Sequence, residues 1–333
     1  MARKRSMKQR KLEPAVQTVT FVLPDGESTV DLSRCASLVN RRFYRQGINW
    51  VVAGFRFFKP GATPTPGTGI SVSRLPNTWV LGNAWEKAFR HWQELNKRAL
   101  AAGESLPGRF TDFKVYMDSI HHGSSLTSNS NLLPVDSTAT PATAGEWEYS
   151  KIVYPNTALP GGAGTAEILA VGANFPGAGT SGLNGVSLIE GYANSRALPS
   201  IVDPNTPGDA TDVAGGTPEN WLGAMHNDGN TQEFAVITDL TTENNLAPYP
   251  FENDGTATDT MYPGGANQLS GLQFVDGAYF NATDNANKLY LKGDNFPCGL
   301  VRISSNAGGS ITMAIDLVPG THRGYLCEPM TEM

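Results

Sequence analysis

The sequence predicts an all-β sandwich or barrel, and three observations support this fold class. About eleven short segments alternate apolar and polar residues or are rich in β-branched and aromatic residues. Loops rich in Gly, Pro, Asn, Asp and Thr join them, in keeping with the 36 glycines and 22 prolines of the 333-residue chain. Strands and helices do not alternate as in a parallel α/β fold, and no repeat of 20–50 residues is present.

Turn-forming residues bound the expected strands. The first covers residues 15–23 and ends at Pro24-Asp25-Gly26, and the second covers 48–58 and ends at Lys59-Pro60-Gly61. A Pro/Thr/Gly loop is expected at 60–69. The other strands are expected at 109–120, 146–154, 165–171, 185–192, 232–238, 269–275, 287–292, 299–304 and 310–318.

Only residues 84–102 have a convincing helical pattern. Trp85, Phe89 and Trp92 recur at helical spacing, so we expect their stripe to face the core or another subunit. Asn83 is expected to cap the start of the helix, and Gly103 to follow its end.

Charge is divided unevenly along the chain. Residues 1–122 hold 19 of the 25 Lys and Arg residues and 9 of the 31 acids, a balance of +10. Residues 123–333 hold the remaining 6 basic residues and 22 acids, a balance of −16, so the net charge is −6. Such asymmetry favours a nucleic-acid or membrane contact on the basic side.

The strongest positive charge lies at the start of the chain. The first eleven residues contain no acid and six basic residues, which are Arg3, Lys4, Arg5, Lys8, Arg10 and Lys11. Alone, this arm would repel itself and bury nothing, but beside phosphates it would gain free energy by releasing counterions. We interpret it as a nucleic-acid-binding arm. A nuclear-localisation signal and a solvated tail are the alternatives.

A second basic cluster, formed by Arg41, Arg42 and Arg45, precedes the expected strand at 48–58. It is a candidate for the same nucleic-acid surface, and Arg34 is a further candidate. A solvated patch, or one paired with another subunit, is the alternative.

The sequence indicates no enzyme, no cofactor and no metal site. Cys35, Cys298 and Cys327 are far apart and are expected to be buried thiols. The adjacent His121 and His122 are expected to form a structural pair at a strand end, because neighbouring strand residues point to opposite faces.

The remaining acidic motifs are also weak. Glu146 and Glu148 are expected on an exposed strand edge, without a catalytic partner. Residues 203–208 match only part of a calcium loop, which leaves interface calcium open. The basic start lacks the apolar segment of a signal peptide, and no run of eighteen apolar residues suggests membrane insertion.

The order of these features resembles the capsid proteins of small circular single-stranded DNA viruses, particularly those known from environmental genomes. The matching features are the basic arm, the first strand, the Trp-rich segment from Asn83 to Trp92, the segment Phe110–Asp118 and the closing segment Ile315–Gly324. The resemblance implies a single eight-stranded antiparallel jelly roll, an icosahedral shell of identical copies and an arm that faces a single-stranded DNA genome. The arm is shorter here than in many of these proteins, so Arg34 and the second basic cluster are expected to share in packaging.

Two regions follow from this interpretation: a flexible arm at 1–14 and a jelly-roll capsid domain at 15–333, with a projecting insertion within 193–268 left open. The virion is the expected location, with the host nucleus as a further location during assembly. No host receptor can be named. A carbohydrate-binding or adhesin-like β-sandwich is the alternative function, and a hydrolase on a β scaffold has no supporting set of residues.

Overall fold

In the computed structural model, the described residues are 14–59, 67–106, 108, 111–123, 131–155, 163–172, 184–195, 233–243, 271–280 and 287–332. The chain divides into two compact units: residues 1–191 combine with 262–333, and residues 192–261 form the other. Of the second unit, the structure describes the end of helix α4 (Leu188–Ser195) and helix α6 (Phe234–Glu243).

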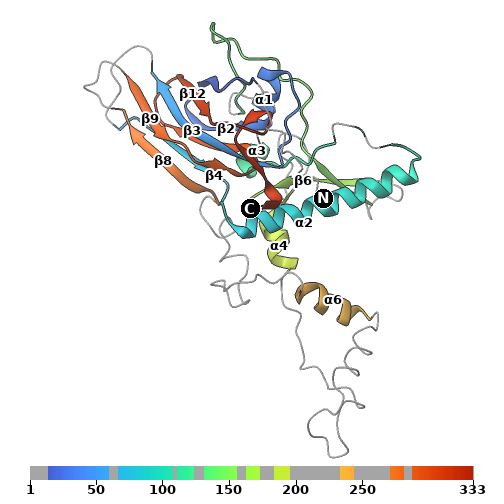
Figure 1. The fold of residues 1–333 in the computed structure, drawn as a ribbon. Helices are drawn as coiled ribbons and strands as arrows, with labels where there is room; N and C mark the ends of the chain where they lie inside the picture. Colours follow the sequence, from blue (N-terminus) through green and yellow to red (C-terminus); the bar gives the residue numbers. More distant parts are fainter. Residues whose placement is uncertain are drawn as a thin grey trace, which may run out of the picture. The chain divides into compact units, whose positions relative to one another are not determined.

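Two antiparallel sheets form the core of the first unit (Figure 1). In the first sheet, β12 pairs with β1 on one side and with β3 on the other, and β3 also pairs with β9. The bounds of these strands are β1 (Thr18–Leu23), β3 (Ile48–Phe58), β9 (Lys288–Lys292) and β12 (Ile311–Leu317). The N-terminal half of β3 pairs with the short strands β10 (Asn295–Phe296) and β15 (Cys327–Pro329).

The second sheet has the order β2-β11-β4-β8, and every neighbouring pair in it is antiparallel. Its strands are β2 (Gly26–Asp31), β4 (Gly69–Arg74), β8 (Gln273–Tyr279) and β11 (Leu300–Ser305). Segments far apart in the sequence therefore lie side by side in both sheets. The predicted all-β sandwich is confirmed at this level.

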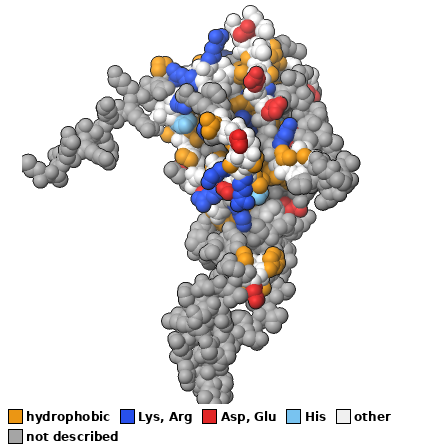
Figure 2. Space-filling model, turned by 90° about the vertical axis from the view of Figure 1, so that its right-hand side faces the viewer, with side chains coloured by type: hydrophobic (Ala, Val, Ile, Leu, Met, Phe, Trp, Pro, Cys, Tyr) orange, Lys and Arg blue, Asp and Glu red, His pale blue; other side chains and the backbone are white. Residues whose placement is uncertain are grey.

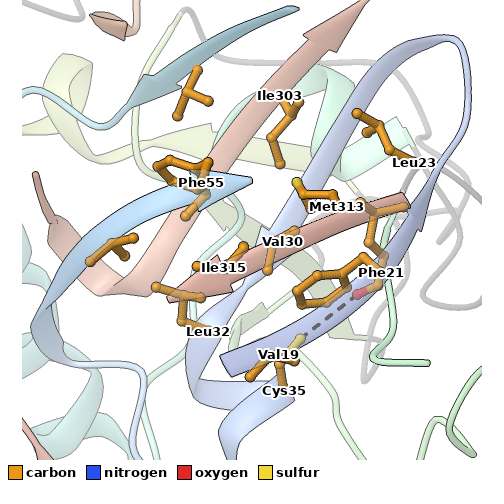
Figure 3. Packing of buried hydrophobic residues seen from close by; sticks show 14 of the residues in the cluster. Val19, Phe21, Leu23, Val30, Leu32, Cys35, Phe55, Ile303, Met313 and Ile315 are labelled. Carbon is orange, nitrogen blue, oxygen red and sulfur yellow. Dashed lines mark hydrogen bonds between the residues drawn. The ribbon is translucent and has the colours of Figure 1, made fainter. Parts of the chain in front are cut away.

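Alternating side chains of the two sheets meet in one apolar core (Figure 3). Phe21 of β1 is opposite Met313 of β12, which is opposite Phe57 of β3, and all three are fully buried. From the other sheet, Val30 and Ile303 join the same cluster. Burying each such side chain contributes roughly 1.5–3 kcal/mol, so this layer is the main source of stability.

Smaller elements lie outside the sandwich. A three-stranded sheet joins β5 (Lys151–Pro155), β6 (Ala163–Leu169) and β7 (Asn184–Ser187), with β5–β6 antiparallel and β6–β7 parallel. Helix α1 (Leu32–Asn40) follows β2 directly, and a short helix α3 (Ser119–Gly123) precedes the small sheet. The C-terminal segment adds the two-residue strands β13 (Pro319–Gly320) and β14 (Gly324–Tyr325) and short 3₁₀ turns at Pro297–Gly299 and Met330–Glu332.

Helix α2 (Trp79–Ala102) contains the segment predicted to be helical, but it begins five residues earlier than expected. Thr78 caps it, because its side-chain oxygen accepts a hydrogen bond from the Leu81 N–H at 3.4 Å. Asn83 therefore lies inside the helix, and the prediction that it is the cap was wrong. Gly103 follows the last helical residue as predicted, and its N–H donates to the carbonyl of Ala99 at 2.9 Å.

Several other predicted elements differ in the structure. Strands β2 and β4 and helix α1 were not predicted, and β8 lies four residues later than the strand expected at 269–275. The segment expected as a strand at 232–238 begins helix α6 at Phe234. A short apolar run has no reliable periodicity, which explains that error. The segment expected at 185–192 is strand β7 followed directly by helix α4.

The described part of the stretch predicted as a strand at 109–120, residues 111–120, does not join a sheet ladder, and its last two residues, Ser119 and Ile120, begin helix α3. The side chain of Gln46 takes the place of a neighbouring strand, since it accepts from the Val115 N–H at 2.6 Å and donates to the Val115 carbonyl at 3.0 Å. A single bridge, Tyr116 to Leu169, links this stretch to the small sheet.

Candidate nucleic-acid interface

The predicted arm lies outside the described residues, which begin at Pro14. Its six basic residues, Arg3, Lys4, Arg5, Lys8, Arg10 and Lys11, therefore remain predictions. The second predicted cluster, Arg41, Arg42 and Arg45, is described, and all three of its residues are exposed.

Helix α1 positions this cluster. Asp31 caps the start of the helix by accepting from the Arg34 N–H at 3.1 Å, and the helix ends at Arg41. Arg41 has a left-handed backbone (φ 51°, ψ 39°), a conformation that usually favours glycine at this position. This turn brings Arg41 and Arg42 to the surface at the C-terminal end of the helix, where the helix dipole favours cations.

Arg42 connects this surface to the base of the arm. Its Nη1 donates to the carbonyl oxygen of Pro14 at 3.2 Å. Two residues further on, the Val16 N–H donates to Asn40 Oδ1 at 3.0 Å, and the Tyr325 hydroxyl donates to the Val16 carbonyl at 2.7 Å. The chain is thus fixed at Pro14–Val16, and the arm begins beside the second basic cluster.

Arg45 is held by three neighbours. Its guanidinium carbon lies 5.6 Å from the centre of the Phe43 ring, a cation–π contact. Its Nη1 lies 3.9 Å from Asp112 Oδ1 and donates a hydrogen bond to the carbonyl of Thr111. Part of its charge is therefore balanced within the protein.

Lys114 adds a cation that sequence reasoning missed. Its ammonium lies 4.8 Å from the centre of the Trp147 ring and 4.0 Å from Asp112 Oδ2. The Ser150 side chain fixes the backbone of Lys114, since its oxygen accepts from the Lys114 N–H at 2.9 Å. Residues 114 and 147 are far apart in the sequence, so no local pattern could have placed them together.

Arg41, Arg42 and Lys114 line one groove of about 420 Å³, which we call the arm-root groove. Its basic and aromatic lining residues are Arg34, Arg41, Arg42, Phe43, Lys114 and Trp147. The single acidic residue in the lining is Glu146. Four basic side chains against one acid give a positive lining. Positive grooves that carry aromatic rings are typical of sites for single-stranded nucleic acid.

Arg34 was expected to share in binding the packaged nucleic acid, but its position differs from that expectation. Its side chain is 2% exposed and lies at the base of the groove, so it does not provide a surface contact for phosphates. Its charge still adds to the positive potential of the groove. Arg45 lies at the border of this groove, through its contact with Phe43.

Asp112 is the acidic group paired with Arg45 and Lys114. It is 8% exposed, and burial raises its pKa to about 6, although Lys114, the Gln46 N–H and Arg45 each act to lower it. The Gln46 N–H donates to Asp112 Oδ2 at 3.2 Å. The groove therefore becomes more positive as Asp112 takes up a proton.

The two adjacent histidines lie in helix α3 and not at a strand end, so that part of the prediction was wrong. Both are buried. His121 Nδ1 accepts from the Met117 N–H at 3.0 Å, and His121 Nε2 lies 3.1 Å from the Tyr149 hydroxyl. His122 Nε2 lies 2.8 Å from Glu167 Oε2. Both histidines thus hold the small sheet and the segment before it together, as a structural pair would.

A buried polar network continues from these histidines. The Tyr149 hydroxyl donates to Asp31 Oδ2 at 3.4 Å, and Arg302 Nη2 donates to Asp118 Oδ1 at 2.5 Å. Burial raises the pKa of the Asp31 carboxyl and lowers the pKa of His121 well below its usual value. The groups of this network are buried and bonded to one another, so we interpret it as structural.

The structure also describes the two glutamates and three cysteines considered as candidates from the sequence. Glu146 and Glu148 are exposed as expected, but they precede strand β5 and do not belong to it. Cys35 and Cys298 are buried and Cys327 is half-buried, all three as free thiols. The Cys35 thiol donates to the carbonyl of Leu132 at 3.8 Å (Figure 3).

The described residues contain no group of three or more His, Cys, Asp or Glu side chains placed to hold a metal ion. Within the same part of the chain, no helix is long and apolar enough to cross a membrane.

Comparison with known proteins gives no match to a protein family, to a curated protein or to a solved structure.

Proposed function

We propose that this chain is a viral capsid protein: a single jelly roll that assembles with copies of itself into a closed shell and packages nucleic acid. The observation that carries the proposal is the pairing order of its eight main strands. Numbered along the chain as β1, β2, β3, β4, β8, β9, β11 and β12, the first pairs with the eighth and the second with the seventh. The third pairs with the sixth and the fourth with the fifth.

This order is what results when one long antiparallel ribbon folds over into two sheets. Jelly rolls have this double-sheet arrangement of eight strands, and capsid and lectin domains are prominent users of it. The two remaining pairings, β12 with β3 and β11 with β4, join neighbouring ribbon segments within each sheet. The strand order therefore supports the jelly roll that the resemblance implies.

The arm-root groove supports packaging. Arg41, Arg42 and Lys114 line it, and the arm with its six further basic residues begins beside it at Pro14. Cations in such an arrangement neutralise phosphates and release counterions without reading sequence. In this proposal the groove and the arm face the packaged genome, single-stranded DNA.

The proposal assigns no enzymatic role, and it places the protein in the virion, with the host nucleus as a further location during assembly. Its test is negative-stain electron microscopy of the purified recombinant protein at low and high salt. We expect uniform closed shells whose absorbance ratio at 260 and 280 nm reports nucleic acid. Monomers or small oligomers under every condition would overturn the proposal.

A carbohydrate-binding module is the second candidate, because one hollow on the outer face of the second sheet has suitable walls. This hollow of about 330 Å³ is lined by Phe274 and Tyr279, which are 65% and 74% exposed, and by the polar side chains of Ser71, Ser304 and Asn306. Exposed aromatic rings can stack on the flat faces of sugars, and polar groups beside them can bond the sugar hydroxyls. Glycan affinity in a monomer that forms no shells would favour this candidate over the capsid protein.

A further inference from the structure

A second and larger hollow lies along helix α2. It has a volume of about 830 Å³, and its most important lining residues are Arg45, Phe89, Arg90, Trp92, Lys97 and Leu100. We call it the α2 hollow. Its volume falls in the range of about 300–1,000 Å³ that is usual for ligand sites.

The aromatic residues at the α2 hollow pack against one another. Phe89 stacks on Trp85 with ring centres 4.9 Å apart and an angle of 23°. Phe113 packs against Phe89 at 5.8 Å and against Trp92 at 5.6 Å. Trp85, Trp92 and Phe113 are buried, and they pack around the half-buried Phe89. A flat ligand in the hollow would therefore meet Phe89 as its principal aromatic ring.

The other walls of the hollow are mainly cationic. Arg45, Arg90 and Lys97 stand against the single acid Glu94 in the lining. Figure 2 shows Lys and Arg side chains gathered on the face toward which the C-terminal end of α2 points in Figure 1. Aromatic rings between cations match the two parts of a nucleotide, a flat base and a phosphate.

The α2 hollow also adjoins the arm-root groove. Arg45 and Thr111 line the hollow, and Phe43 and Lys114 line the groove. Arg45 contacts Phe43 across this border, and Asp112 lies between Thr111 and Lys114 in the sequence and within 4.0 Å of both Arg45 and Lys114. A strand that leaves the groove therefore meets the hollow next.

We propose that the α2 hollow binds unpaired bases of single-stranded nucleic acid, with Phe89 as the stacking ring and Arg45, Arg90 and Lys97 as phosphate contacts. This proposal rests on the packaging role proposed above and extends it. On this proposal, the Trp-rich helix binds nucleic acid, and the shell prefers unpaired to duplex nucleic acid. The hollow reads no sequence, because every base offers a flat face.

Helix α2 offers a matched pair of variants for the test. Arg90 and Arg98 each form an exposed i,i+4 pair with a glutamate, and each side chain is 75% exposed, but only Arg90 lines the hollow. Binding of a fluorescent oligo(dT) probe to the full-length protein is measured at several salt concentrations. The logarithm of the affinity falls as the logarithm of the salt concentration rises. We expect Arg90→Gln to make this fall less steep by about 0.7, the value of one phosphate contact with a single strand. Arg98→Gln is expected to leave the slope unchanged.

A cross-linking experiment locates the base without any substitution. Oligonucleotides that carry 5-iodouracil are irradiated with the wild-type protein, and the tryptic peptides are identified by mass spectrometry. We expect cross-links in Ala88–Arg90, the peptide that carries Phe89, and in His91–Lys97, the peptide that carries the lining residues Gln93 and Asn96. A duplex of the same length is expected to cross-link much less in these peptides, and oligo(rU) compared with oligo(dT) separates RNA from DNA preference.

The outcomes distinguish this inference from the proposed function. If wild-type protein binds the oligonucleotide but the two arginine variants behave alike and cross-links occur only outside α2, the hollow is not a base site and the packaging proposal stands. If the wild-type protein does not bind oligonucleotides at all, both proposals fail. Loss of shells in Arg90→Gln with unchanged oligonucleotide binding would instead identify the hollow as a contact with a second copy of the chain.

Discussion

Arg42 donates a hydrogen bond from its guanidinium Nη1 to the carbonyl oxygen of Pro14, over 3.2 Å. This bond joins the two basic clusters of the sequence, because Pro14 is the residue at which the arm meets the domain. If the arm binds nucleic acid as proposed, its cations start next to those of the arm-root groove. Their contributions to nucleic-acid binding can be separated by changing each in turn.

Deletion of residues 1–11 is expected to leave the fold intact and to lower the nucleic-acid content of purified particles. The deleted residues precede Pro14, so the bonds that fix Pro14 and Val16 remain. Thermal unfolding checks the fold, and the 260/280 nm absorbance ratio of the particles checks the cargo. A variant with the six basic residues changed to Gln keeps the length of the arm and isolates its charge. Unchanged nucleic-acid content in both variants would exclude a packaging role for the arm.

Arg41→Gly is expected to stabilise the protein while it weakens nucleic-acid binding. Arg41 has a left-handed backbone with φ 51°, which glycine adopts without strain, so the unfolding free energy should rise by about 0.5 kcal/mol. The loss of one cation from the groove should reduce the salt slope of single-strand binding by about 0.7. Chemical denaturation and oligonucleotide titration measure the two effects.

Glu104→Gly is the matched control for Arg41→Gly. Glu104 also has a left-handed backbone, with φ 52°, but it does not line the groove. Its substitution removes an anion and not a cation. A similar gain in stability without weaker binding is expected. If both variants weakened binding equally, the effect of Arg41→Gly would be a change in backbone conformation and not a lost phosphate contact.

The sequence predicted those strands whose apolar character is continuous or clearly alternating. Strand β3 has the predicted bounds because its eleven residues are mostly β-branched and aromatic and the turn-forming residue types Pro60 and Gly61 follow soon after it in the sequence. Strands β2 and β4 were missed because serine and threonine occupy several of their positions. Ser28 and Thr29 are nevertheless buried, so the polar residue types concealed the strand.

Only the part of the site whose residues are close together in the sequence could be predicted. Arg41, Arg42 and Arg45 are close in the sequence, and their clustering was visible. Lys114 and Trp147 meet them only through tertiary structure. Gln46, which is fully buried and holds the extended stretch beside the groove, has no sequence signal because a buried glutamine does not differ from an exposed one in the sequence.

Gly293→Ala is expected to destabilise the protein by at least about 3 kcal/mol, within the range of severe core disruptions. An added methyl group at Gly293 would lie 1.9 Å from the carbonyl oxygen of Val52, a backbone atom of the central strand β3. The strand β3 would have to move away, and the whole first sheet depends on it. Gly309→Ala is the control, since an added methyl group there meets no atom within 4 Å. Urea denaturation of the two variants measures the difference, and equal stabilities would contradict the close approach of residue 293 to β3.

Asp112→Asn is expected to change the pH dependence of stability in a defined direction. Burial raises the pKa of Asp112 from 3.8 to about 6, so between these values the folded protein binds a proton that the unfolded chain lacks. The contribution of Asp112 to the unfolding free energy therefore falls as pH rises from about 4 to about 6, by at most about 3 kcal/mol. Asparagine does not titrate, and its carbonyl can still accept from the Gln46 N–H. The variant should therefore gain stability relative to the wild type across this window.

The exposed Asp136 provides a control of opposite sign. Its Oδ1 accepts hydrogen bonds from the Thr138 side chain at 2.7 Å and from the N–H groups of Thr138 and Thr140, and these bonds lower the pKa of Asp136. Its contribution is present above pH 3.8 and is lost as pH falls through the lower folded-state pKa, so Asp136→Asn should lose stability relative to the wild type as pH rises through this range. Denaturation of the wild type and both variants between pH 3 and pH 7 tests the pair. Other titrating groups, including the buried His121, cancel in each difference. A difference for Asp112→Asn that does not vary with pH would show that Asp112 keeps an ordinary pKa in the folded protein, and that its charge opposes Arg45 and Lys114 at every pH in this range.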